Sequence, residues 1–575
     1  MRETPLDEDA SGGRERARVR ASARRASVSV RSWLTFERRL DLLAGGIVLA
    51  GYAIVQLVLL RGPRPFDPAV YWAAGVDFPH VDANLLTLRI GLVAPVKAAV
   101  LAFGPSEAAL YTVPLATGLV LAGAVFGTML LLFGDRVLAA AAALVVALNA
   151  YYLLNSSFIF PDPAATAAFT AGVFFLVLGA ARSGEQGGGR IGTVSLGCAG
   201  VLFGWAYLIR EFSPVLLPTV IAAFVLLRYR ARQIPVLAGA ALATFCLEPL
   251  YGLLRYGDPF VHARWLLGRG DVPVTKIRLA RIEQVQEQLN DPLDTVQVFP
   301  RLLVSWHVGW VFLFFIALFV AALVRTRDRR LWLFAAWCFG FWAVMALLGL
   351  GSLSSGRWIV NITNIRYWSP IFPALVMGAF ASLFLLVPKS LPSVRGLTVT
   401  HAAAAFFVTL ALVPGVVQYR RCAAMNVWPS DPIERWHDLR SWFATPEAQR
   451  YDVIWTDRNT GRYISAFSST TFGKRLWSGA VEWFGRGGAA VPATRSEDSL
   501  LLINKDEFRY PKALSELRTD WSPVFVTNDG AMVVLALKSA GAEPVENQTW
   551  WTLPKDRSQS AAARTCKMQP YSPTE

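Results

Sequence analysis

Long apolar segments alternate with short polar ones along most of the chain. The apolar segments run for roughly 18 to 22 residues with hardly a charge, which at ~1.5 Å per residue is long enough for a helix to cross a ~30 Å hydrocarbon core. The pattern therefore predicts a membrane protein, mainly α, with about eleven spanning helices. The predicted spans are 41–60, 107–133, 137–155, 164–181, 193–209, 212–227, 234–252, 303–324, 331–350, 367–387 and 397–417.

The composition supports this prediction. Of the 575 residues, 54% are hydrophobic and 17% are charged, which is too apolar for an ordinary soluble enzyme. The net charge of +15 would suggest a nucleic-acid partner in a soluble protein, so the position of the basic residues decides its meaning. They cluster at the edges of apolar segments, in 14–39, 228–232 and 325–330. We therefore expect the lipid bilayer, and no nucleic acid, among the partners.

The same clusters predict an orientation. If the N-terminus is cytoplasmic, counting the spans places all of these clusters on the cytoplasmic side, as the positive-inside rule requires. A signal peptide is disfavoured because the first apolar run is long and no small-residue cleavage site clearly follows. The high content of Ala, Arg and Gly favours a bacterial source. We expect a multi-pass protein of the bacterial plasma membrane with an external C-terminal domain.

Changes in composition divide the chain into four parts. The first is rich in Arg, Ser and Ala, the second holds the spans with two long outer loops, the third has the pattern of a soluble domain, and the last is polar. The expected parts are a disordered basic cytoplasmic tail (1–39), a transmembrane domain (40–418) with outer loops 61–106 and 253–302, an external soluble α/β domain (419–540) and a polar tail (541–575).

The external domain shows strand and helix patterns. Residues 451–457 and 499–506 are typical of strands, and 522–537 is typical of a hairpin around an Asn-Asp-Gly turn. Residues 431–444 predict a helix after an Asp cap. The fold class expected is thus a polytopic transmembrane helical bundle with a small external α/β domain at the C-terminus.

Two features outside the spans leave alternatives open. Residues 276–289, in the second outer loop, place apolar side chains roughly on one face, which fits an interfacial helix or a solvated surface helix equally well. Cys422 and Cys566 both lie outside the spans, so an oxidising exterior permits a disulfide between them. Spacing alone does not establish that bond. Cys246 and the other cysteines within spans are expected to be buried structural thiols.

Ionisable residues gather at the outer ends of the spans. A carboxylate in hydrocarbon costs several kcal/mol, so one at a span edge normally faces water, a partner or a substrate. Four separated segments bring such groups to the same depth: "RPFDPAVYWAAG", "FIFPDPAATAAF", "YLIREFSPVLLP" and "NITNIRYWSPIFP". Their ionisable residues are Asp67, Asp162, Arg210 with Glu211, and Arg366 with Tyr367. This convergence is the strongest functional signal in the sequence.

Each of these residues also has a purely structural interpretation. Asp67 and Asp162 both precede Pro, which is a common helix start with the Asp as a cap. Arg210 could extend its charge to the interface, and Arg366 could belong to an aromatic belt. The histidines His80, His262 and His307 show no metal-ligand spacing, so we expect no dedicated metal site. The usual motifs of soluble enzymes, such as GxSxG, the Walker loop and HExxH, are missing.

In their order, these segments resemble a family. "FDPAVYW" after the first span, then "LRIGLVAPVKAAVLAFGPSEAALYTVPLATGLVLAG" (88–123) and "NAYYLLNSSFIFPDPAATAAFTAGVFF" (149–175), are similar to the amino-terminal half of GT-C membrane glycosyltransferases. That superfamily includes the protein O-mannosyltransferases and the lipid A aminoarabinose transferase. "LIREFSPVLLP" and "RYWSPIFPAL" resemble its later segments. The likeness covers roughly residues 41–420, through short and degenerate motifs.

The resemblance implies a function. Such enzymes move a hexosyl or pentosyl unit from a polyprenyl-phosphate donor to a cell-envelope glycan, lipid or protein acceptor on the outer face, and the family favours inversion. It implies that Asp67 is the catalytic base, and that Asp162 orients the acceptor or sugar, or shares a proton or a divalent ion with Asp67. Many relatives carry an adjacent acidic pair where this chain has Pro68, so Asp77 and Asp82 are alternative acids.

The resemblance also implies groups that bind the donor phosphate. Guanidinium groups hold phosphate oxygens bidentately and stabilise the charge that grows on a leaving phosphate. The candidate phosphate-binding residues are Arg210, Arg366, Arg264 and Lys276, with Arg278 as a further basic residue of the second outer loop. Glu211 would orient Arg210, Tyr71 would stack on a sugar ring, and Tyr367 would support the site. No cofactor is required, and a divalent cation is the alternative left open.

Two other functions compete with this one. A lipid or polysaccharide exporter would distribute charges through the centres of its spans, whereas here they gather at the outer ends. A non-catalytic protein of envelope assembly would tolerate the loss of Asp67.

Overall fold

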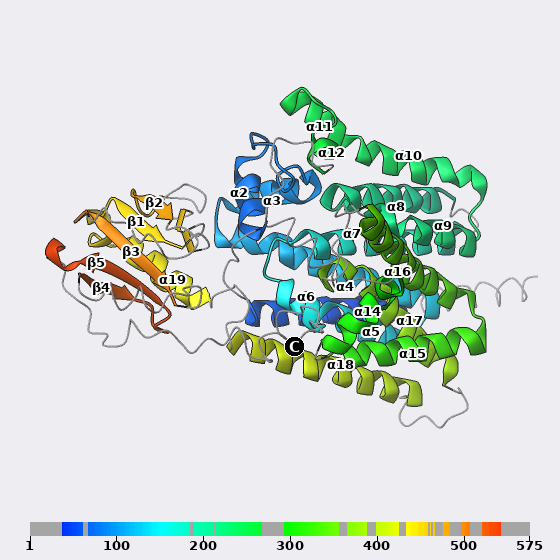
Figure 1. Cartoon of the computed structure of the whole chain (residues 1–575). Coiled ribbons are helices and arrows are strands. Elements are labelled where there is room, and N and C mark those ends of the chain that lie inside the picture. The colour runs from blue at the N-terminus through cyan, green and yellow to red at the C-terminus, as the bar shows by residue number, and fades with distance from the viewer. Residues whose placement is uncertain are drawn as a thin grey trace, which may run out of the picture.

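The computed structural model describes residues 37–60, 67–183, 189–211, 213–266, 292–306, 308–355, 365–387, 398–424, 433–457, 460–461, 464–465, 475–483, 496–505 and 520–541. They form a long helical bundle and a smaller sheet domain beyond one end of it (Figure 1). Helices α2 (Asp67–Asp77) and α3 (Ile90–Phe103) lie at that end of the bundle (Figure 1).

Eight helices of the described residues are long and apolar enough to cross a membrane. They are Glu37–Val58, α4 (Glu107–Phe133), α7 (Pro161–Ser183), α8 (Gly189–Ile209), the continuous run Ala231–Tyr256, α15 (Gly309–Thr326), α16 (Arg329–Ser355) and α18 (Val399–Ala424). Four shorter apolar helices accompany them: α3, α5 (Arg136–Ala147), Ser213–Leu226 and α17 (Ile371–Leu386). Each of the predicted spans coincides with one of these helices, and α3 is an apolar helix that was not predicted.

Several predicted spans are divided more finely than expected. The run Ser213–Leu226 is η1 (Ser213–Leu216) followed by α9 (Leu217–Leu226), and Ala231–Tyr256 is η2 (Ala231–Gln233), α10 (Ile234–Phe245) and α11 (Leu247–Tyr256). The segments between the longer helices contain α12 (Val261–Leu266), α14 (Pro292–Ser305) and η3 (Ile365–Trp368). At the junction of α10 and α11, Cys246 is exposed on the surface of the bundle, so the prediction that it is buried is wrong.

The predicted span 137–155 is two helices rather than one. α5 ends at Ala147 and α6 (Ala150–Asn155) begins after Asn149, whose side-chain oxygen accepts a hydrogen bond from the backbone N–H of Tyr152. Its amide nitrogen donates to the carbonyl oxygen of Val146. The side chain thus satisfies backbone groups on both sides of the break, which lets the chain turn inside an apolar segment.

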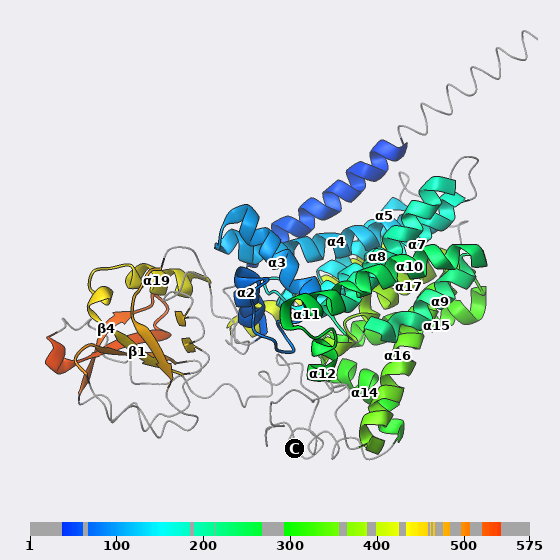
Figure 2. The same ribbon diagram turned by 90° about the horizontal axis from the view of Figure 1, so that it is seen from above.

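The bundle is held together by apolar packing, with buried side chains from most of its helices. α7 is the central helix. Of the eight candidate spans, it has the largest share of buried residues. In Figure 2, the first helix runs along the outside of the bundle, consistent with its low burial. The polar groups of the site therefore stand on helices whose own positions are fixed by close packing.

The C-terminal domain is a five-stranded sheet in the order β2-β1-β3-β5-β4. Its elements are α19 (Ile433–Phe443), η4 (Ala448–Arg450), β1 (Val453–Thr456), β2 (Ala480–Trp483), β3 (Ser499–Asn504), β4 (Trp521–Val526), β5 (Met532–Leu537) and η6 (Lys538–Ala540). β1 pairs in parallel with β2 and β3, while β5 pairs antiparallel with β3 and β4.

The predicted elements of this domain are confirmed, and β2 was not predicted. The hairpin of β4 and β5 turns at Gly530, whose φ of 69° is one that glycine adopts readily. Trp436 and Leu439 on α19 pack against β3 and β5 residues in one apolar core. The combination of a mainly α bundle with a small α/β domain is the fold class predicted from the sequence.

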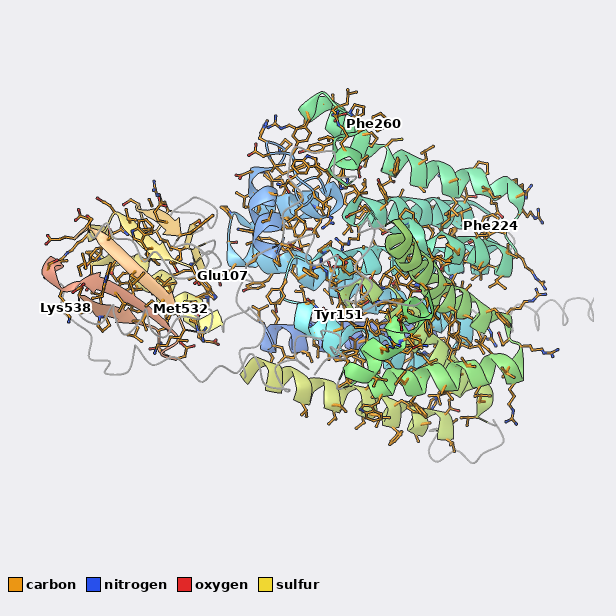
Figure 3. The ribbon with its side chains drawn as sticks, viewed as in Figure 1. Glu107, Tyr151, Phe224, Phe260, Met532 and Lys538 are labelled. Atoms are coloured by element: carbon orange, nitrogen blue, oxygen red, sulfur yellow. The ribbon has the colours of Figure 1, made fainter. Side chains whose placement is uncertain are left out.

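The sheet domain touches the bundle through charged side chains. Glu107, in the first turn of α4, accepts hydrogen bonds from Arg440 and, at 3.1 Å, contacts Nε2 of His437 on α19. Figure 3 labels Glu107 on the side of the bundle that faces the sheet domain. The predicted helix at 276–289 and Cys566 lie outside the described residues.

Candidate active site

Four segments that are far apart in the sequence meet at the end of the bundle nearest the sheet domain (Figure 1). Asp67 begins α2, Asp162 lies in the first turn of α7, Arg210 follows α8, and Arg366 lies in η3. The structure thus brings together one residue from each of the four segments that were expected to share one depth.

Arg366 lies between the two carboxylates. Its Nη1 is 3.8 Å from Oδ2 of Asp67, and its Nε is 4.0 Å from Oδ2 of Asp162. The other oxygen of Asp162 is 3.1 Å from Nε of Arg210. The cluster therefore contains two carboxylates and two guanidinium groups, in alternating order, and its formal charges cancel.

Burial separates this cluster into an enclosed pair and an accessible pair. The side chains of Asp162 and Arg210 are 0% and 4% exposed, whereas those of Asp67 and Arg366 are 32% and 28% exposed. A substrate can therefore reach Asp67 and Arg366 directly. Asp162 and Arg210 can act on it only through their neighbours.

The local sequence explains why the two carboxylates stand at helix starts. Each is followed by a proline, Pro68 or Pro163, which suits the first turn because that position needs no N–H donor. A carboxylate in the first turn also interacts favourably with the positive end of the helix dipole, by about 0.3–1 kcal/mol. Asp162 is the second residue of α7, and neither of its buried carboxylate oxygens accepts a hydrogen bond from the described residues, so the structure does not support its interpretation as a helix cap.

Tyr367 lies against both guanidinium groups. Its hydroxyl accepts a hydrogen bond of 3.2 Å from Nη2 of Arg366. The central carbon of Arg210 lies 5.0 Å from the centroid of its ring, and that of Arg366 lies 4.9 Å from it, both within cation-π range. Arg366 also lies 5.4 Å from the ring centroid of Phe160. The aromatic rings restrict the two cations to one side of the site.

The short helix η3 that carries Arg366 is fixed by buried hydrogen bonds. The hydroxyl of Tyr152 donates to the carbonyl oxygen of Ser369 at 2.9 Å, and the Ser369 and Thr166 hydroxyl oxygens are 3.2 Å apart. Thr166 stands one turn after Asp162 on α7. The backbone around Arg366 is thus tied to the helix that carries the buried carboxylate. None of these three polar residues was singled out in the sequence.

Arg89 is a further charged residue of the site that the sequence analysis missed. It is 3% exposed, donates to Oε2 of Glu211 from Nε at 3.0 Å and to Oε1 from Nη2 at 2.6 Å, and also donates to the hydroxyl of Tyr71. Burial alone would raise the pKa of Glu211, but the guanidinium groups of Arg89 and Arg210 outweigh it and lower that pKa to about 2.

These contacts correct two expectations. Tyr71 is 0% exposed and its hydroxyl binds Arg89, so its ring is not available to stack on a sugar in the opening of the site. Glu211 forms its two hydrogen bonds with Arg89 and not with Arg210, its neighbour in the chain. The reason is geometric, because adjacent residues point in different directions while Arg89 reaches both carboxylate oxygens with two parallel N–H groups.

The remaining candidates lie elsewhere. Asp77 is the last residue of α2, ten residues after Asp67 or ~15 Å along the helix axis, and both Asp77 and Asp82 are exposed. Arg264 on α12 forms an ion pair with Asp258. Lys276, Arg278 and His307 lie outside the described residues. His80 is exposed, and His262 lies 3.1 Å from Glu248 in a separate buried pair.

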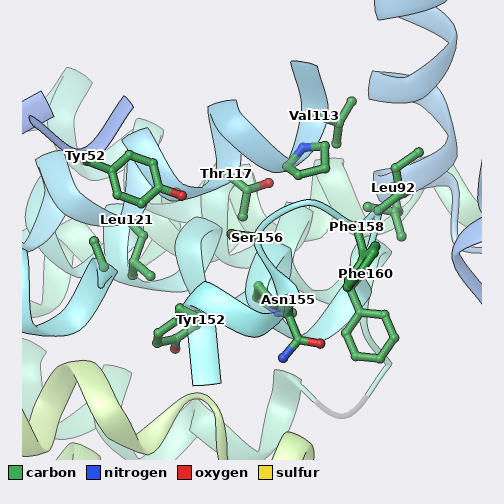
Figure 4. Close-up of a pocket in the computed structure, with 15 residues that line it drawn as sticks. Tyr52, Leu92, Val113, Thr117, Leu121, Tyr152, Asn155, Ser156, Phe158 and Phe160 are labelled. Atoms are coloured by element: carbon green, nitrogen blue, oxygen red, sulfur yellow. The ribbon is translucent and has the colours of Figure 1, made fainter. Parts of the chain in front are cut away.

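A cavity lies beside the charged cluster, between the first helix, α4 and the segment 147–163 (Figure 4). It is small, with room for little more than a water molecule. Its wall is largely apolar, and the residues with hydroxyl or amide groups are Tyr52, Thr117, Tyr152, Asn155 and Ser156. Phe160 borders both this cavity and Arg366.

The carboxylates of the cluster do not fit a metal site. Within the described residues, no group of three or more His, Cys, Asp or Glu side chains could hold a metal ion. Arg366 already lies between Asp67 and Asp162 and supplies positive charge to both. A divalent ion shared by these two carboxylates would have to displace that guanidinium group.

Comparison with known proteins gives similarities to solved structures. No family model and no curated protein matches the chain. ArnT from Cupriavidus metallidurans bound to undecaprenyl phosphate matches with a TM-score of 0.46 and 12% identity, over 89% of this chain and 99% of that one. The oligosaccharyltransferase AglB from Archaeoglobus fulgidus, in complex with an inhibitory peptide and a dolichol-phosphate, matches with a TM-score of 0.42 and 14% identity, over 76% of this chain and 64% of that one.

A second structure of the Archaeoglobus fulgidus oligosaccharyltransferase, in complex with Zn and sulfate, matches with a TM-score of 0.43 and 16% identity, over 73% of this chain and 61% of that one. In these two matches the chain spans less than two thirds of the length of the archaeal enzyme. An oligosaccharyltransferase and ArnT are therefore among the solved structures that this chain resembles.

Proposed function

We propose that this protein is a membrane glycosyltransferase, which moves a sugar from a polyprenyl-phosphate donor to a hydroxyl group of a cell-envelope glycan, lipid or protein. The observation that carries the proposal is the accessible pair of Asp67 and Arg366, 3.8 Å apart, at the opening of an otherwise buried charged cluster. One of these groups can accept a proton and the other can hold a phosphate, which are the two tasks that the reaction requires.

Asp67 acts as the general base. As the acceptor oxygen forms its bond to the anomeric carbon, its proton passes to the carboxylate of Asp67, and the bond from the anomeric carbon to the phosphate oxygen breaks. The electron pair of that bond stays on the phosphate. A positioned base contributes about 10²- to 10⁴-fold to such a step. Direct attack by the acceptor inverts the anomeric centre.

Arg366 stabilises the leaving phosphate. Its guanidinium group is accessible and can form two parallel hydrogen bonds with phosphate oxygens. Arg210 is 4% exposed, so it acts through the electrostatic field of the site and not by direct contact. Fixed positive charge in a site sheltered from water stabilises developing negative charge far more than it would in bulk solvent.

Asp162 holds the two guanidinium groups in place. It is fully buried and lies within 4.0 Å of both Arg210 and Arg366, so an acceptor cannot reach it for proton transfer. Removing its charge would leave two cations close together in a region of low dielectric constant, which is strongly unfavourable. Its role is therefore to orient Arg366, and the accessible Asp67 is the better candidate for the base.

The proposed donor is a lipid phosphate. The AglB and ArnT structures described above hold a dolichol-phosphate and undecaprenyl phosphate, respectively. For this chain we propose a ligand of the same class, with its phosphate at Arg366. The basic clusters 228–232 and 325–330 lie at the ends of α9 and α15 that are far from the site. We therefore propose that the site is on the outer face, the N-terminus in the cytoplasm of a bacterium and the sheet domain outside.

The proposed reaction needs no divalent cation. Zinc was bound in one structure of the archaeal oligosaccharyltransferase. Here Arg366 and Arg210 supply the positive charge that a metal ion would provide next to the phosphate. An exporter is disfavoured because these groups lie at helix ends and form a closed, charge-neutral cluster, which does not provide a path across the bilayer.

The proposal is tested with purified protein in lipid nanodiscs. Polyprenyl phosphates carrying radiolabelled mannose, glucose, galactose or arabinose are each incubated with membrane extract as the acceptor. We expect label to move to the extract with at least one donor, at a rate that depends on the protein. A lack of transfer from every donor, together with transport of the lipid across sealed vesicles, would identify an exporter.

A further inference from the structure

Arg89 links α2 to the residues that follow α8. It precedes α3, and its guanidinium group donates to the hydroxyl of Tyr71 on one side and to both carboxylate oxygens of Glu211 on the other. With 3% of its side chain exposed, the arginine is enclosed between these partners. A charge-assisted contact with two oxygens fixes both distance and direction, which a single point charge does not.

Both partners of Arg89 stand next to residues of the proposed reaction. Tyr71 follows Asp67 by one turn on α2, so the two side chains lie on the same face of that helix. Glu211 directly follows Arg210, which pairs with the buried Asp162. Asp67 is thus connected to the buried pair of Asp162 and Arg210 by two series of contacts. One series includes Arg89, and the other includes Arg366.

The backbone beside Arg89 is built for this close approach. A Cβ atom on Gly91 would lie 2.7 Å from the carbonyl carbon of Leu208 and 2.7 Å from the backbone nitrogen of Ile209. Only glycine therefore lets the start of α3 pack directly on the end of α8. This contact brings Arg89 within reach of Glu211, two residues beyond Ile209.

A second basic residue of α3 holds the far end of α2. Nζ of Lys97 donates to the carbonyl oxygen of Val76 at 2.7 Å. α2 is thus attached to α3 near its middle by Arg89 and at its end by Lys97, while its first residue, Asp67, faces Arg366. Loss of the Arg89 contact would remove the polar link of α2 that lies nearest to the base, and leave that part of the helix held by apolar packing.

We propose that Arg89 is a positioning residue, which sets the separation of Asp67 and the guanidinium groups of the site by joining α2 to the end of α8. This inference rests on the glycosyl transfer proposed above. Arg89 is not a ligand of the donor phosphate, because it is enclosed and already binds a carboxylate with two of its nitrogen atoms. Its effect on the reaction is exerted through Tyr71 and Glu211.

The test compares Arg89→Lys with the wild type. Lysine keeps the charge but cannot bind Tyr71 and both oxygens of Glu211 at once. A displacement of about 1 Å between a reacting group and its partner can lower a rate by about 10²-fold. We therefore expect kcat to fall roughly 10²-fold, with a change in the donor KM of less than about threefold.

Arg435→Lys serves as the matched control. Arg435 is also buried, at 2% exposed, and its Nε lies 2.7 Å from a carboxylate oxygen of Asp529, but it belongs to the sheet domain. We expect kcat and KM of this variant to match those of the wild type. If Arg89→Lys lowers only the yield of folded protein, and kcat per folded molecule is unchanged, the residue is merely structural. A large rise in the donor KM at constant kcat would make it a phosphate ligand, which also overturns the proposal.

Hydrogen exchange provides a measurement that needs no activity. We expect the amides of α2 to exchange faster in Arg89→Lys than in the wild type, and the amides of α19 to exchange equally in both. Unchanged exchange in α2 would overturn the positioning role even if the enzyme were active. Faster exchange in a protein that transfers no sugar would support the link between the elements and refute the proposed reaction, so the two failures are distinguishable.

Discussion

The guanidinium group of Arg366 lies 3.8 Å from the carboxylate of Asp67, and solvent reaches both side chains. Arg366 also lies 4.0 Å from the enclosed carboxylate of Asp162. The arginine is therefore shared between an anion that a substrate can touch and one that it cannot. This arrangement gives each charged residue a separate role and leads to the following predictions.

Replacing Arg366 by Lys or Gln tests its contact with the donor. Lysine retains a charge but loses the two parallel donors, and glutamine loses the charge as well. We expect the donor KM to rise about tenfold in Arg366→Lys and further in Arg366→Gln, with kcat lowered in both, because a bidentate phosphate contact is lost. Steady-state kinetics with varied donor concentration measures this. The control is Arg301→Lys, an exposed residue 2.8 Å from Asp294, which should leave both constants unchanged.

Replacing Asp162 by Asn tests the buried pair. Arg210 would keep its charge in an enclosed position without the carboxylate that neutralises it. Breaking such a pair costs about 3–5 kcal/mol of stability, so we expect a clearly lower Tm in nanodiscs along with loss of transfer. In the double variant Asp162→Asn/Arg210→Gln, we expect Tm to recover partly while activity stays low. A single variant as stable as the wild type would show that the pair is not the anchor described here.

The pair of Glu211 and Arg89 predicts a specific dependence of stability on pH. The pKa of Glu211 is lowered from 4.5 to about 2, so its contribution to stability is complete above about pH 5 and is lost as the pH falls toward about 2. We expect the difference in Tm between wild type and Glu211→Gln to be constant from about pH 8 to about pH 5 and to shrink at lower pH. A difference that changes between about pH 6 and pH 8 would mean that the carboxylate titrates in that range, contrary to the structure.

Chelation tests whether arginine side chains, and not a metal ion, supply the positive charge of the site. Because Arg366 lies between Asp67 and Asp162, we expect the rate of transfer to be unchanged after treatment with EDTA and after addition of Mg²⁺ or Mn²⁺. A rate that EDTA abolishes and a divalent ion restores would require a metal at the phosphate, and would assign a different role to the arginine.

Much of the fold follows from local patterns in the sequence. Each apolar run became a helix, because a chain in hydrocarbon must satisfy its backbone hydrogen bonds within the segment. The break at Asn149 was missed, since hydropathy records polarity averaged over a window and not the capping of one residue. Strand β2 was missed because only four residues pair, and their side chains are mostly exposed.

The site was predicted less completely than the fold. The sequence indicated Asp67, Asp162, Arg210 and Arg366, since charges at span edges can be placed at a common depth. It did not reveal that Arg89 pairs with Glu211, because that contact joins residues 122 positions apart and depends on how α3 packs on α8. A signal was present in "LRIGLV", where an arginine stands at the start of an apolar run.

Replacing Asp67 by Asn tests the central claim most directly. Loss of a helix cap costs only about 1 kcal/mol, while loss of the base should lower the rate by about 10²- to 10⁴-fold. The measurement compares sugar transfer from the active donor by wild type, Asp67→Asn and the control Asp77→Asn. A thermal melt first shows that the Tm values of the three proteins agree within a few degrees. We predict loss of transfer in Asp67→Asn and wild-type transfer in Asp77→Asn. Full activity of a folded Asp67→Asn would contradict the account.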